Sequence, residues 1–324
     1  MKALSFAVAL GVTLACAVGA RAQNYPSKPV TMIVPFPAGG GSDILARIVA
    51  EHMRGSLGQP VIIENVGGAG GTIGTARVVR AAPDGYTIGF GQWTSHVGAG
   101  ALYALPFDLL KDLTPVSRLT LARLWIIGRH DLPANNFKEL IAWLKANPGK
   151  ASAGTIGVGS GTQLCLIDLQ NNTGTQFQLV PYRGAAPILQ DMIAGQIDLT
   201  CPEAGQTLAQ YRGGKIKAYA VMGKTRWFAA PDVPTTDEAG APGLDMTFWY
   251  GLWAPAGTPR DIVAKLNAAV ANVFSDATVR QRLIEQGHEF PPREQQTPEA
   301  LGAHHKAEIE KWWPIIKAAG IKLQ

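Results

Sequence analysis

The sequence predicts an α/β protein with two domains, each a mainly parallel sheet flanked by helices. Short apolar runs rich in β-branched residues alternate with segments of helical periodicity through most of the chain, a pattern typical of parallel strands joined by helices. Nine such runs occur, whereas an ordinary sheet holds about five or six strands. The length of 324 residues therefore suits two sheets better than one.

The expected strands are the short apolar runs, because turn-forming residues bound them. In chain order they are Val30–Val34, Val61–Glu64, Tyr86–Phe90, Leu124–Ile127, Ser152–Ile156, Gln178–Val180, Ile197–Cys201, Ile216–Val221 and Trp249–Ala254.

The expected helices are the segments in which apolar residues recur every three or four positions. In the first, Ile44, Ile48 and Val49 follow this spacing, and Ser42 is expected to be the N-cap. In chain order the helices are Asp43–Leu57, Ile73–Ala81, Phe137–Ala146, Gln163–Asn172, Ala186–Ala194, Ala204–Tyr211, Pro259–Phe274, Ala277–Gln286 and Pro298–Ala319.

Two segments mark candidate domain boundaries. One boundary is expected near the polar segment Pro115–Arg123, and the other near the Pro-rich stretch Ala229–Pro242, which has the composition of a connector. With α/β material on both sides of each, we expect residues 123–231 to form a domain inserted into a first domain made of residues 23–122 and 232–324.

The first residues are typical of a secretory signal peptide. Lys2 is followed by an apolar run over residues 3–19 and by Ala20-Arg21-Ala22, a small-x-small cleavage site. The run is shorter than the ~20 apolar residues of a membrane span, so we prefer a signal peptide over residues 1–22 to a membrane anchor. Lipidation at Cys16 is an alternative that the sequence leaves open. The expected location is the periplasm.

Composition excludes several classes of protein. With 47% hydrophobic and 16% charged residues, the chain can bury enough apolar surface to fold. The net charge of +5 comes from scattered residues, and the densest basic cluster, Lys215-Ile216-Lys217, has no interleaved aromatic residues. We therefore expect no nucleic-acid partner. We also expect a monomer that needs no cofactor or metal.

Four turns between an expected strand and the segment after it carry small or polar residues. They are Pro35–Asp43, Asn65–Thr72, Gln92–His96 and Gly157–Thr162. A glycine-rich turn before a helix exposes several backbone N–H groups beside the positive end of the helix dipole, and so can hold an anion without Arg or Lys. For any single turn, the alternative is that glycine only permits a tight bend. Across two domains, anion binding is the better interpretation.

The nucleotide-binding motifs do not match. Gly68-x-Gly70 would need a third glycine at Ile73, and Gly157-x-Gly159 would need one at Thr162.

Candidate catalytic and metal-binding patterns are also weak. Ser42 and Ser160 both fail the Gly-x-Ser-x-Gly pattern. His304, His305 and Glu308 form a close cluster of possible ligands, but their helix is rich in Lys and Glu. We therefore expect a solvated helix face there rather than a metal site.

Two cysteines, Cys165 and Cys201, follow the signal peptide. In an exported protein a pair of thiols favours a disulfide over a nucleophile, and both are predicted near the same edge of the middle domain. We expect them to be bridged.

Seven strings along the chain carry a family resemblance. They are Tyr25–Val30, Val34–Asp43, Ala82–Tyr86, Val180–Gly184, Gly195–Asp198, Pro231–Thr235 and Gly251–Pro259. In their order and spacing, over essentially the whole mature chain, they resemble the substrate-binding proteins of tripartite tricarboxylate transporters, also called the Bug family. The resemblance implies the "Venus flytrap" fold of type II periplasmic binding proteins, with the ligand between two domains.

The resemblance also implies which residues contact the ligand. On the first domain they are Phe36, Ala38, Gly39, Gly40 and Asp43 after the first strand, and Trp93, Thr94, Ser95 and His96 after the third. On the inserted domain they are Ser160, Thr162, Gln163, the Tyr182-Arg183-Gly184 turn, Pro202 and Glu203. For Trp93, packing in the core stays an equal alternative to stacking on a ligand.

Two positions depart from the family pattern. The family commonly has His where Gln163 stands, and Gln forms hydrogen bonds but cannot become cationic near neutral pH. An acidic or polar residue common at the position of Pro202 is displaced here to Glu203. The identity of the ligand therefore cannot be copied from a relative.

The function implied is capture of a small organic carboxylate, either a dicarboxylate or an aromatic carboxylate, for the permease subunits of a tripartite tricarboxylate-type transporter. A sensor subunit that presents its ligand to a signalling partner stays open, because it would use the same closure. An exported α/β hydrolase would need a positioned nucleophile and base that no motif supplies. We expect no enzymatic activity.

Overall fold

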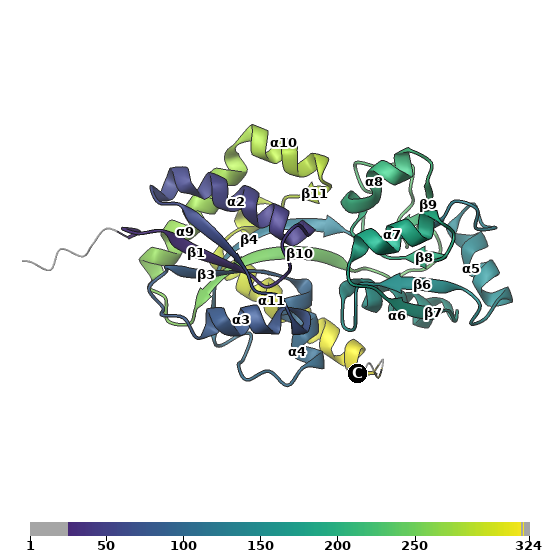
Figure 1. Cartoon of the computed structure of the whole chain (residues 1–324), viewed down its shortest axis with the longest axis horizontal. Coiled ribbons are helices and arrows are strands. Elements are labelled where there is room, and N and C mark those ends of the chain that lie inside the picture. The colour runs from purple at the N-terminus through teal and green to yellow at the C-terminus, as the bar shows by residue number, and fades with distance from the viewer. Residues whose placement is uncertain (1–24, 319, 321–324) are drawn as a thin grey trace, which may run out of the picture.

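The computed structural model describes residues 25–318 and 320, which form two sheets side by side (Figure 1). The first sheet has six strands in the order β11-β4-β10-β3-β1-β2. Their bounds are β1 Val30–Val34, β2 Val61–Asn65, β3 Thr87–Gln92, β4 Leu113–Arg123, β10 Thr247–Pro255 and β11 His288–Glu289. The second sheet has five strands in the order β7-β6-β8-β5-β9. Their bounds are β5 Trp125–Arg129, β6 Ser152–Thr155, β7 Gln178–Pro181, β8 Leu199–Thr200 and β9 Ile216–Val221.

Ten α-helices and three shorter helical turns are present in this part of the chain. The α-helices are α2 Gly41–Leu57, α3 Thr72–Val79, α4 Ala99–Leu102, α5 Phe137–Ala146, α6 Gly161–Thr173, α7 Ala185–Ile193, α8 Ala204–Arg212, α9 Arg260–Ser275, α10 Ala277–Glu285 and α11 Pro298–Ala318. The shorter turns are η2 Ala69–Gly71, the π-helical η3 Thr94–Gly98 and η4 Arg293–Gln295.

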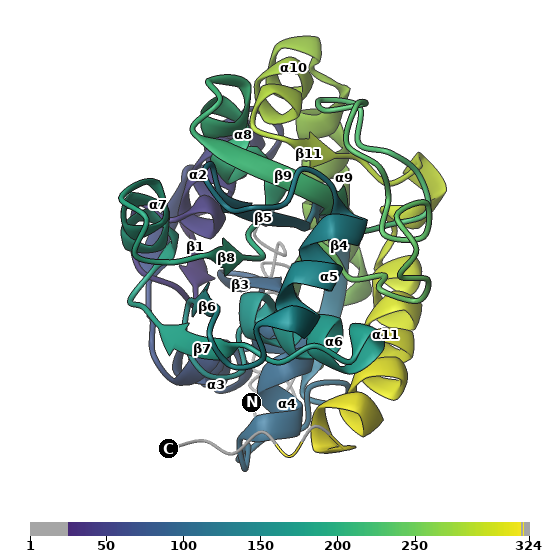
Figure 2. The ribbon, with the colours of Figure 1, turned by 90° about the vertical axis from the view of Figure 1, so that its right-hand side faces the viewer.

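Helices cover both sheets on both faces. Around the first sheet, α2 and α10 lie on one side and α3 and α4 on the other (Figure 1). Figure 2 shows the strands of the second sheet from β9 down to β7, with α5 on one side and α7 on the other. Each strand and helix expected from the sequence is found within two residues at each end, except that the expected last residue of α11, Ala319, lies outside the described residues.

Both sheets are mixed, which corrects the expectation of mainly parallel sheets. In the first, β1 pairs in parallel with β2 and β3, whereas β10 is antiparallel to β3 and β4. In the second, β6 is parallel to β7 and β8, and β5 is antiparallel to β8 and β9. The antiparallel strands β4, β5, β9 and β10 are those that flank the two crossings of the chain between the sheets.

The polar segment near which a boundary was expected, Pro115–Arg123, is most of strand β4, which was not among the expected strands. Its polar side chains have partners inside the protein. Ser117 Oγ donates to the carbonyl of Gln296 at 2.9 Å, and Thr120 Oγ1 lies 3.2 Å from His288 Nδ1. Hydrogen-bonded polar groups can be buried at little cost, so a half-polar strand lies inside the sheet and the crossing comes only at Leu124.

A disulfide joins Cys165 of α6 to Cys201 after β8, which confirms the expected bridge. Both cysteines are fully buried. The bridge connects the segment after β6 to the segment after β8.

The N-terminal signal peptide and the alternative of lipidation at Cys16 lie outside the described residues. Among the residues that are described, no helix is both long and apolar enough to cross a membrane.

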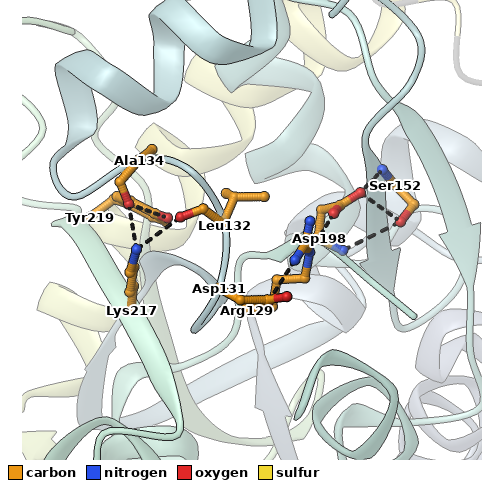
Figure 3. A network of polar contacts seen from close by, with 8 residues as sticks. All are labelled: Arg129, Asp131, Leu132, Ala134, Ser152, Asp198, Lys217 and Tyr219. Atoms are coloured by element: carbon orange, nitrogen blue, oxygen red, sulfur yellow. Dashed lines mark hydrogen bonds and ion pairs between the residues drawn. The ribbon is translucent and has the colours of Figure 1, made fainter. Parts of the chain in front are cut away.

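A network of polar contacts lies at one end of the strands of the second sheet (Figure 3). Asp198 accepts hydrogen bonds from Arg129 Nε at 2.8 Å, from the Ser152 backbone N–H at 2.8 Å and from the Ser152 hydroxyl at 3.2 Å. Lys217 Nζ donates to the carbonyls of Leu132 and Ala134 at 2.8 and 2.9 Å. These contacts join β5, β6 and β8 at the end where β6 and β8 begin, so the Gly195–Asp198 string has a structural role there.

We expect Asp198→Asn to lower the free energy of unfolding by about 1–3 kcal/mol, because it removes the charged acceptor of three donors. Chemical denaturation with urea measures this change.

The matched control is Asp131→Asn. Asp131 pairs with the same guanidinium, Nη1 to Oδ1 at 2.6 Å, but its side chain is 72% exposed, and exposed ion pairs contribute little. Equal losses in the two variants would contradict a structural role specific to Asp198.

Candidate functional site

The ends of strands from the two sheets meet at one place, which we call the junction. It is formed by the segments that follow β1, β3, β6 and β8. A Cβ placed on Gly41 would lie 3.1 Å from Gln206 Nε2, and one placed on Gly98 would lie 3.2 Å from the carbonyl oxygen of Gly159. Gly41 and Gly98 belong to the first sheet's connections and Gln206 and Gly159 to the second's, so the expected site residues after these strands lie on facing edges.

The turn between β1 and α2 presents an open helix N-terminus. The N-cap is Gly40, and no side chain caps it. This corrects the expectation that Ser42 is the N-cap: the helix begins at Gly41, and Ser42 lies inside its first turn. Ala38, Gly39 and Gly40 are exposed. Because the first N–H groups of a helix have no partner within it, this turn can accept an anion.

Asp43 holds this turn in shape. Its carboxylate accepts hydrogen bonds from the Gly39 backbone N–H at 2.8 Å, Arg47 Nε at 2.9 Å and Asn65 Nδ2 at 3.0 Å. Burial raises the pKa of Asp43, but these hydrogen bonds outweigh it and hold the pKa below its ordinary value. Asn65 Nδ2 also donates to the carbonyl of Phe36 at 3.0 Å. Asp43 is 3% exposed and its oxygens are occupied, so it positions the turn.

Trp93 lies in the core, which favours that alternative over stacking on a ligand. Its side chain is fully buried, and its ring packs edge-on against Trp312 with centroids 5.4 Å apart. Its indole Nε1 donates to Glu308 Oε2 at 3.1 Å, and Trp249 Nε1 donates to the same oxygen at 3.2 Å. Glu308 therefore ties the segment after β3 to strand β10.

Thr94, Ser95 and His96 open the buried π-helical turn η3. The Thr94 N–H donates to Gln92 Oε1 at 2.9 Å. Ser95 Oγ lies 2.9 Å from His96 Nδ1, and the His96 ring stacks on Trp253 with centroids 3.9 Å apart. Burial and the neighbouring His305 hold the pKa of His96 well below its ordinary value. These three side chains are buried in this structure. The turn approaches the second sheet's connections at Gly98, beside the Gly159 carbonyl oxygen.

The expected solvated face at His304, His305 and Glu308 was a wrong prediction. His305 is 1% exposed, and its Nε2 lies 2.6 Å from the His96 carbonyl oxygen. Burial lowers the pKa of His304 to about 3 and that of His305 to about 4. This face of α11 packs on β4 and η3, although its sequence is rich in charge. Among the described residues, no group of three or more His, Cys, Asp or Glu is placed to hold a metal ion.

On the second sheet, Ser160 and Gln163 organise the turn after β6. Ser160 is the N-cap of α6, where its Oγ accepts from the Gln163 N–H at 3.2 Å and donates to the Gly157 carbonyl at 2.8 Å. Gln163 Oε1 accepts from the Gly159 N–H at 2.7 Å. Thr162 is 6% exposed. In this structure the side chains of Ser160 and Gln163 hydrogen-bond within the turn.

The Tyr182 hydroxyl donates to Asp191 Oδ2 of α7 at 2.6 Å. Burial and this carboxylate raise the pKa of Tyr182 to about 12. Arg183 is exposed, and Gly184 is the N-cap of α7 with no side chain capping it. The Tyr182 side chain is therefore bound to its own domain.

Glu203 and Tyr250 connect the two sheets at the junction. Glu203 is the N-cap residue of α8, follows buried Pro202 and is partly buried. The Tyr250 hydroxyl, on β10, donates to both Glu203 oxygens at 2.8 Å. Burial raises the pKa of Glu203 to about 7, and the Tyr250 hydrogen bond only partly offsets it.

Sequence reasoning missed Tyr250 and Gln206 as junction residues. Tyr250 lies in an apolar strand, which indicates a core residue. Gln206 is an ordinary helix residue, so no local pattern separates it from others. Their role follows from contacts with segments far away in the chain: Tyr250 contacts Glu203, and Gln206 lies beside the start of α2.

A cavity of about 160 Å³ lies elsewhere, between the segment before β4, β4 itself and α11. It is lined by Leu109, Leu110, Leu113, Pro115, Trp253, Gly302, His305 and Lys306. It does not include the residues of the junction.

Comparison with known proteins identifies relatives over almost the whole chain. A family model described as the tripartite tricarboxylate transporter family receptor matches residues 45–321. The solved structure of periplasmic binding protein BugD is 39% identical with a TM-score of 0.83, covering 93% of this chain and 100% of that one. MatC from Rhodopseudomonas palustris with bound malate is 37% identical, TM-score 0.83, covering 90% and 100%. An R. palustris protein with adipate is 31% identical, TM-score 0.84, covering 92% and 99%. These matches confirm the resemblance and the periplasmic-binding-protein fold expected from the sequence.

The buried His305 gives a pH-dependent prediction. Its pKa is about 4 in the folded protein against about 6.5 when unfolded, so the unfolded state binds more protons between these values and stability falls as pH falls. We expect the stability advantage of the wild type over His305→Gln to be about 2 kcal/mol smaller at pH 5 than at pH 7.

Urea unfolding of both proteins at the two pH values measures this difference, in which the contributions of titrating groups that do not interact with His305 cancel. Ile309→Val, a buried change on the same helix without a titrating group, should show the same stability difference at both pH values. A pH-independent difference for His305→Gln would show that His305 is not held neutral.

Proposed function

Because this chain belongs to the tripartite tricarboxylate transporter receptor family, we propose that it binds a small organic carboxylate between its two sheets and delivers it to the permease of such a transporter. The relatives solved with malate and adipate support a carboxylate as the ligand. The observation that carries the proposal is the open N-terminus of α2 at the junction.

The turn over Gly39–Asp43 provides the positive end of the α2 helix dipole, where an anion can bind. It offers backbone N–H groups of a helix N-terminus that no side chain caps, and Asp43 fixes its shape through Gly39. Charge-assisted hydrogen bonds contribute roughly 1.5–3 kcal/mol each. A few of them, after the losses on association, are compatible with micromolar affinity, about −8 kcal/mol. Phe36, Ala38, Gly39 and Gly40 are the proposed contacts here.

The second sheet forms the opposite side of the proposed ligand site. Its proposed contacts are the turn of Ser160, Thr162 and Gln163 and the segment of Glu203. The ligand favours closure of the two domains only to the extent that it binds the closed arrangement more tightly than the open one. Tyr182 and the side chains of Trp93 and His96 are bound elsewhere in this structure, so we assign them supporting roles.

The proposed domain division follows the sheets. We propose residues 23–122 and 232–324 as one domain and residues 123–231 as the other. The crossing at Leu124 and the packing of Trp227, Ala230 and Val233 in the core of the second sheet support bounds within a few residues of these.

The proposed location is the periplasm, after removal of a signal peptide over residues 1–22. Membership in a receptor family supports binding without chemical conversion. Ser95 and His96 are in contact, but both are at most 2% exposed, which argues against a nucleophile and base there. Pull-down from membranes distinguishes a transporter, which retains a permease, from a sensor subunit, which retains a kinase.

We expect Gly40→Val to weaken carboxylate binding by at least about tenfold, because the side chain covers the open N–H groups of the turn. The fold should survive: Gly40 has φ −79° and ψ 168°, and the nearest atom to an added Cβ is the Pro37 carbonyl oxygen at 3.7 Å.

Thermal shift against mono-, di- and aromatic carboxylates, including malate and adipate, identifies a binder, and calorimetry then compares the variants. The control is Gly55→Val at the other end of α2, where an added Cβ meets no atom within 4 Å. Unchanged affinity in Gly40→Val would refute the anion site, and a panel without any binder would refute carboxylate capture.

A further inference from the structure

The cavity between β4 and α11 has the size of a small ring compound. Its volume is about 160 Å³, and an engineered protein cavity of about 150 Å³ with apolar walls binds benzene. Most of the residues that line it are apolar, and they include three leucines and Pro115. Leu110 and Lys306 line it as well and are exposed, so the cavity can be entered from solvent.

Trp253 carries an unused hydrogen-bond donor in the lining of this cavity. Its side chain is 1% exposed, and its indole Nε1 has no hydrogen-bond partner among the described residues. By contrast, the equally buried Trp93 and Trp249 both donate their indole N–H groups to Glu308. A buried N–H without a partner costs free energy, so a molecule that brings an acceptor to Trp253 recovers that cost.

The charges around the cavity favour an uncharged molecule. Burial lowers the pKa of His305 to about 4, so its ring is neutral at pH 7. Its Nε2 lies 2.6 Å from the His96 carbonyl oxygen, which places the ring proton on Nε2. The Lys306 ammonium is exposed and lies 3.8 Å from Glu310 Oε1. An anion inside the cavity would therefore lack a buried positive charge, and burying an unpaired ion is costly.

The cavity adjoins η3, although it includes no residue of the junction. The Trp253 ring stacks on His96 of η3 with centroids 3.9 Å apart, and His305 contacts the His96 carbonyl oxygen. Trp253 and His305 both line the cavity. A molecule in the cavity therefore touches two side chains that pack against η3.

We propose that this cavity is a second ligand site, which takes a small uncharged ring compound whose hydrogen-bond acceptor pairs with Trp253 Nε1. The apolar lining removes the ring from water, and the acceptor satisfies the indole N–H. This site does not depend on carboxylate capture at the junction. For a molecule of about six heavy atoms we expect a dissociation constant of about 1 mM or below.

Two isosteric probes test the proposal. Tetrahydropyran and cyclohexane have rings of the same size, but only tetrahydropyran carries an acceptor oxygen. In ¹H–¹⁵N NMR titrations of the full protein, we expect tetrahydropyran to bind and to shift the indole N–H signal of Trp253 downfield. Cyclohexane should bind without this downfield shift, because it offers no acceptor.

Trp253→Phe removes the indole N–H and identifies its signal. The affinity for tetrahydropyran relative to cyclohexane should fall about fivefold in this variant, the worth of one neutral hydrogen bond. Any change in the size of the cavity affects both probes alike and cancels in the ratio. If Trp253→Phe does not fold, sequential assignment of the wild-type indole signal keeps the downfield shift measurable.

Gly302→Val tests the location of the site. Gly302 lines the cavity, and an added Cβ would lie 3.3 Å from Pro115 Cγ, so the valine fills space there while the proline needs to move only slightly. Binding of both probes should be lost. The control is Gly55→Val, where an added Cβ meets no atom within 4 Å, and both probes should bind it as they bind the wild type.

Each outcome decides one part of the proposal. Failure of tetrahydropyran to bind the wild type below about 1 mM, or equal binding to Gly302→Val, would overturn the second site. Binding that leaves the Trp253 signal unchanged would overturn the selection of an acceptor. None of these results alters the carboxylate test of the junction, because the probes carry no charge.

Discussion

The antiparallel pairing of β4 with β10 is the constraint on which the arrangement of the molecule depends. These long strands lie next to the two places where the chain passes between the sheets, and they pair over most of their length. Because they are hydrogen-bonded to each other, the two crossings lie side by side, and the loops that follow β1, β3, β6 and β8 are brought to one junction. Tyr250 reaches Glu203 from β10, so the same strand that connects the halves also supplies a polar contact between them.

Most of the regular structure could be predicted from the sequence because its signals are local. Strands β1 and β9 and helix α5 have the expected bounds, since apolar periodicity and turn residues define them. Strand β4 was missed because its Ser117 and Thr120 depend on Gln296 and His288, which are about 170 residues away in the chain. The solvated face expected at His304 and His305 failed for the same reason: charge along a helix does not reveal what packs on it.

The candidate site was predictable in part. The glycine-rich turn after β1 is located correctly, because the need for glycine at Gly39, with φ +83°, is a property of the local sequence. The N-cap was expected at Ser42 and lies at Gly40 instead. The different roles of the acidic residues Asp43 and Glu203 were not predictable. Asp43 binds the turn's own backbone, and the carboxylate that faces the junction with few partners is Glu203 from the other sheet. Which acidic residue is satisfied and which is not depends on neighbours that only the folded chain provides.

The bridge between Cys165 and Cys201 has a consequence for how the protein is made. It fastens the helix that follows β6, with Ser160 at its start, to the segment that leads into Glu203. These two parts of the second wall therefore move as one body once the bond has formed. A reducing environment keeps thiols from forming this bond, so recombinant protein needs an oxidising route of production if these two parts are to stay joined.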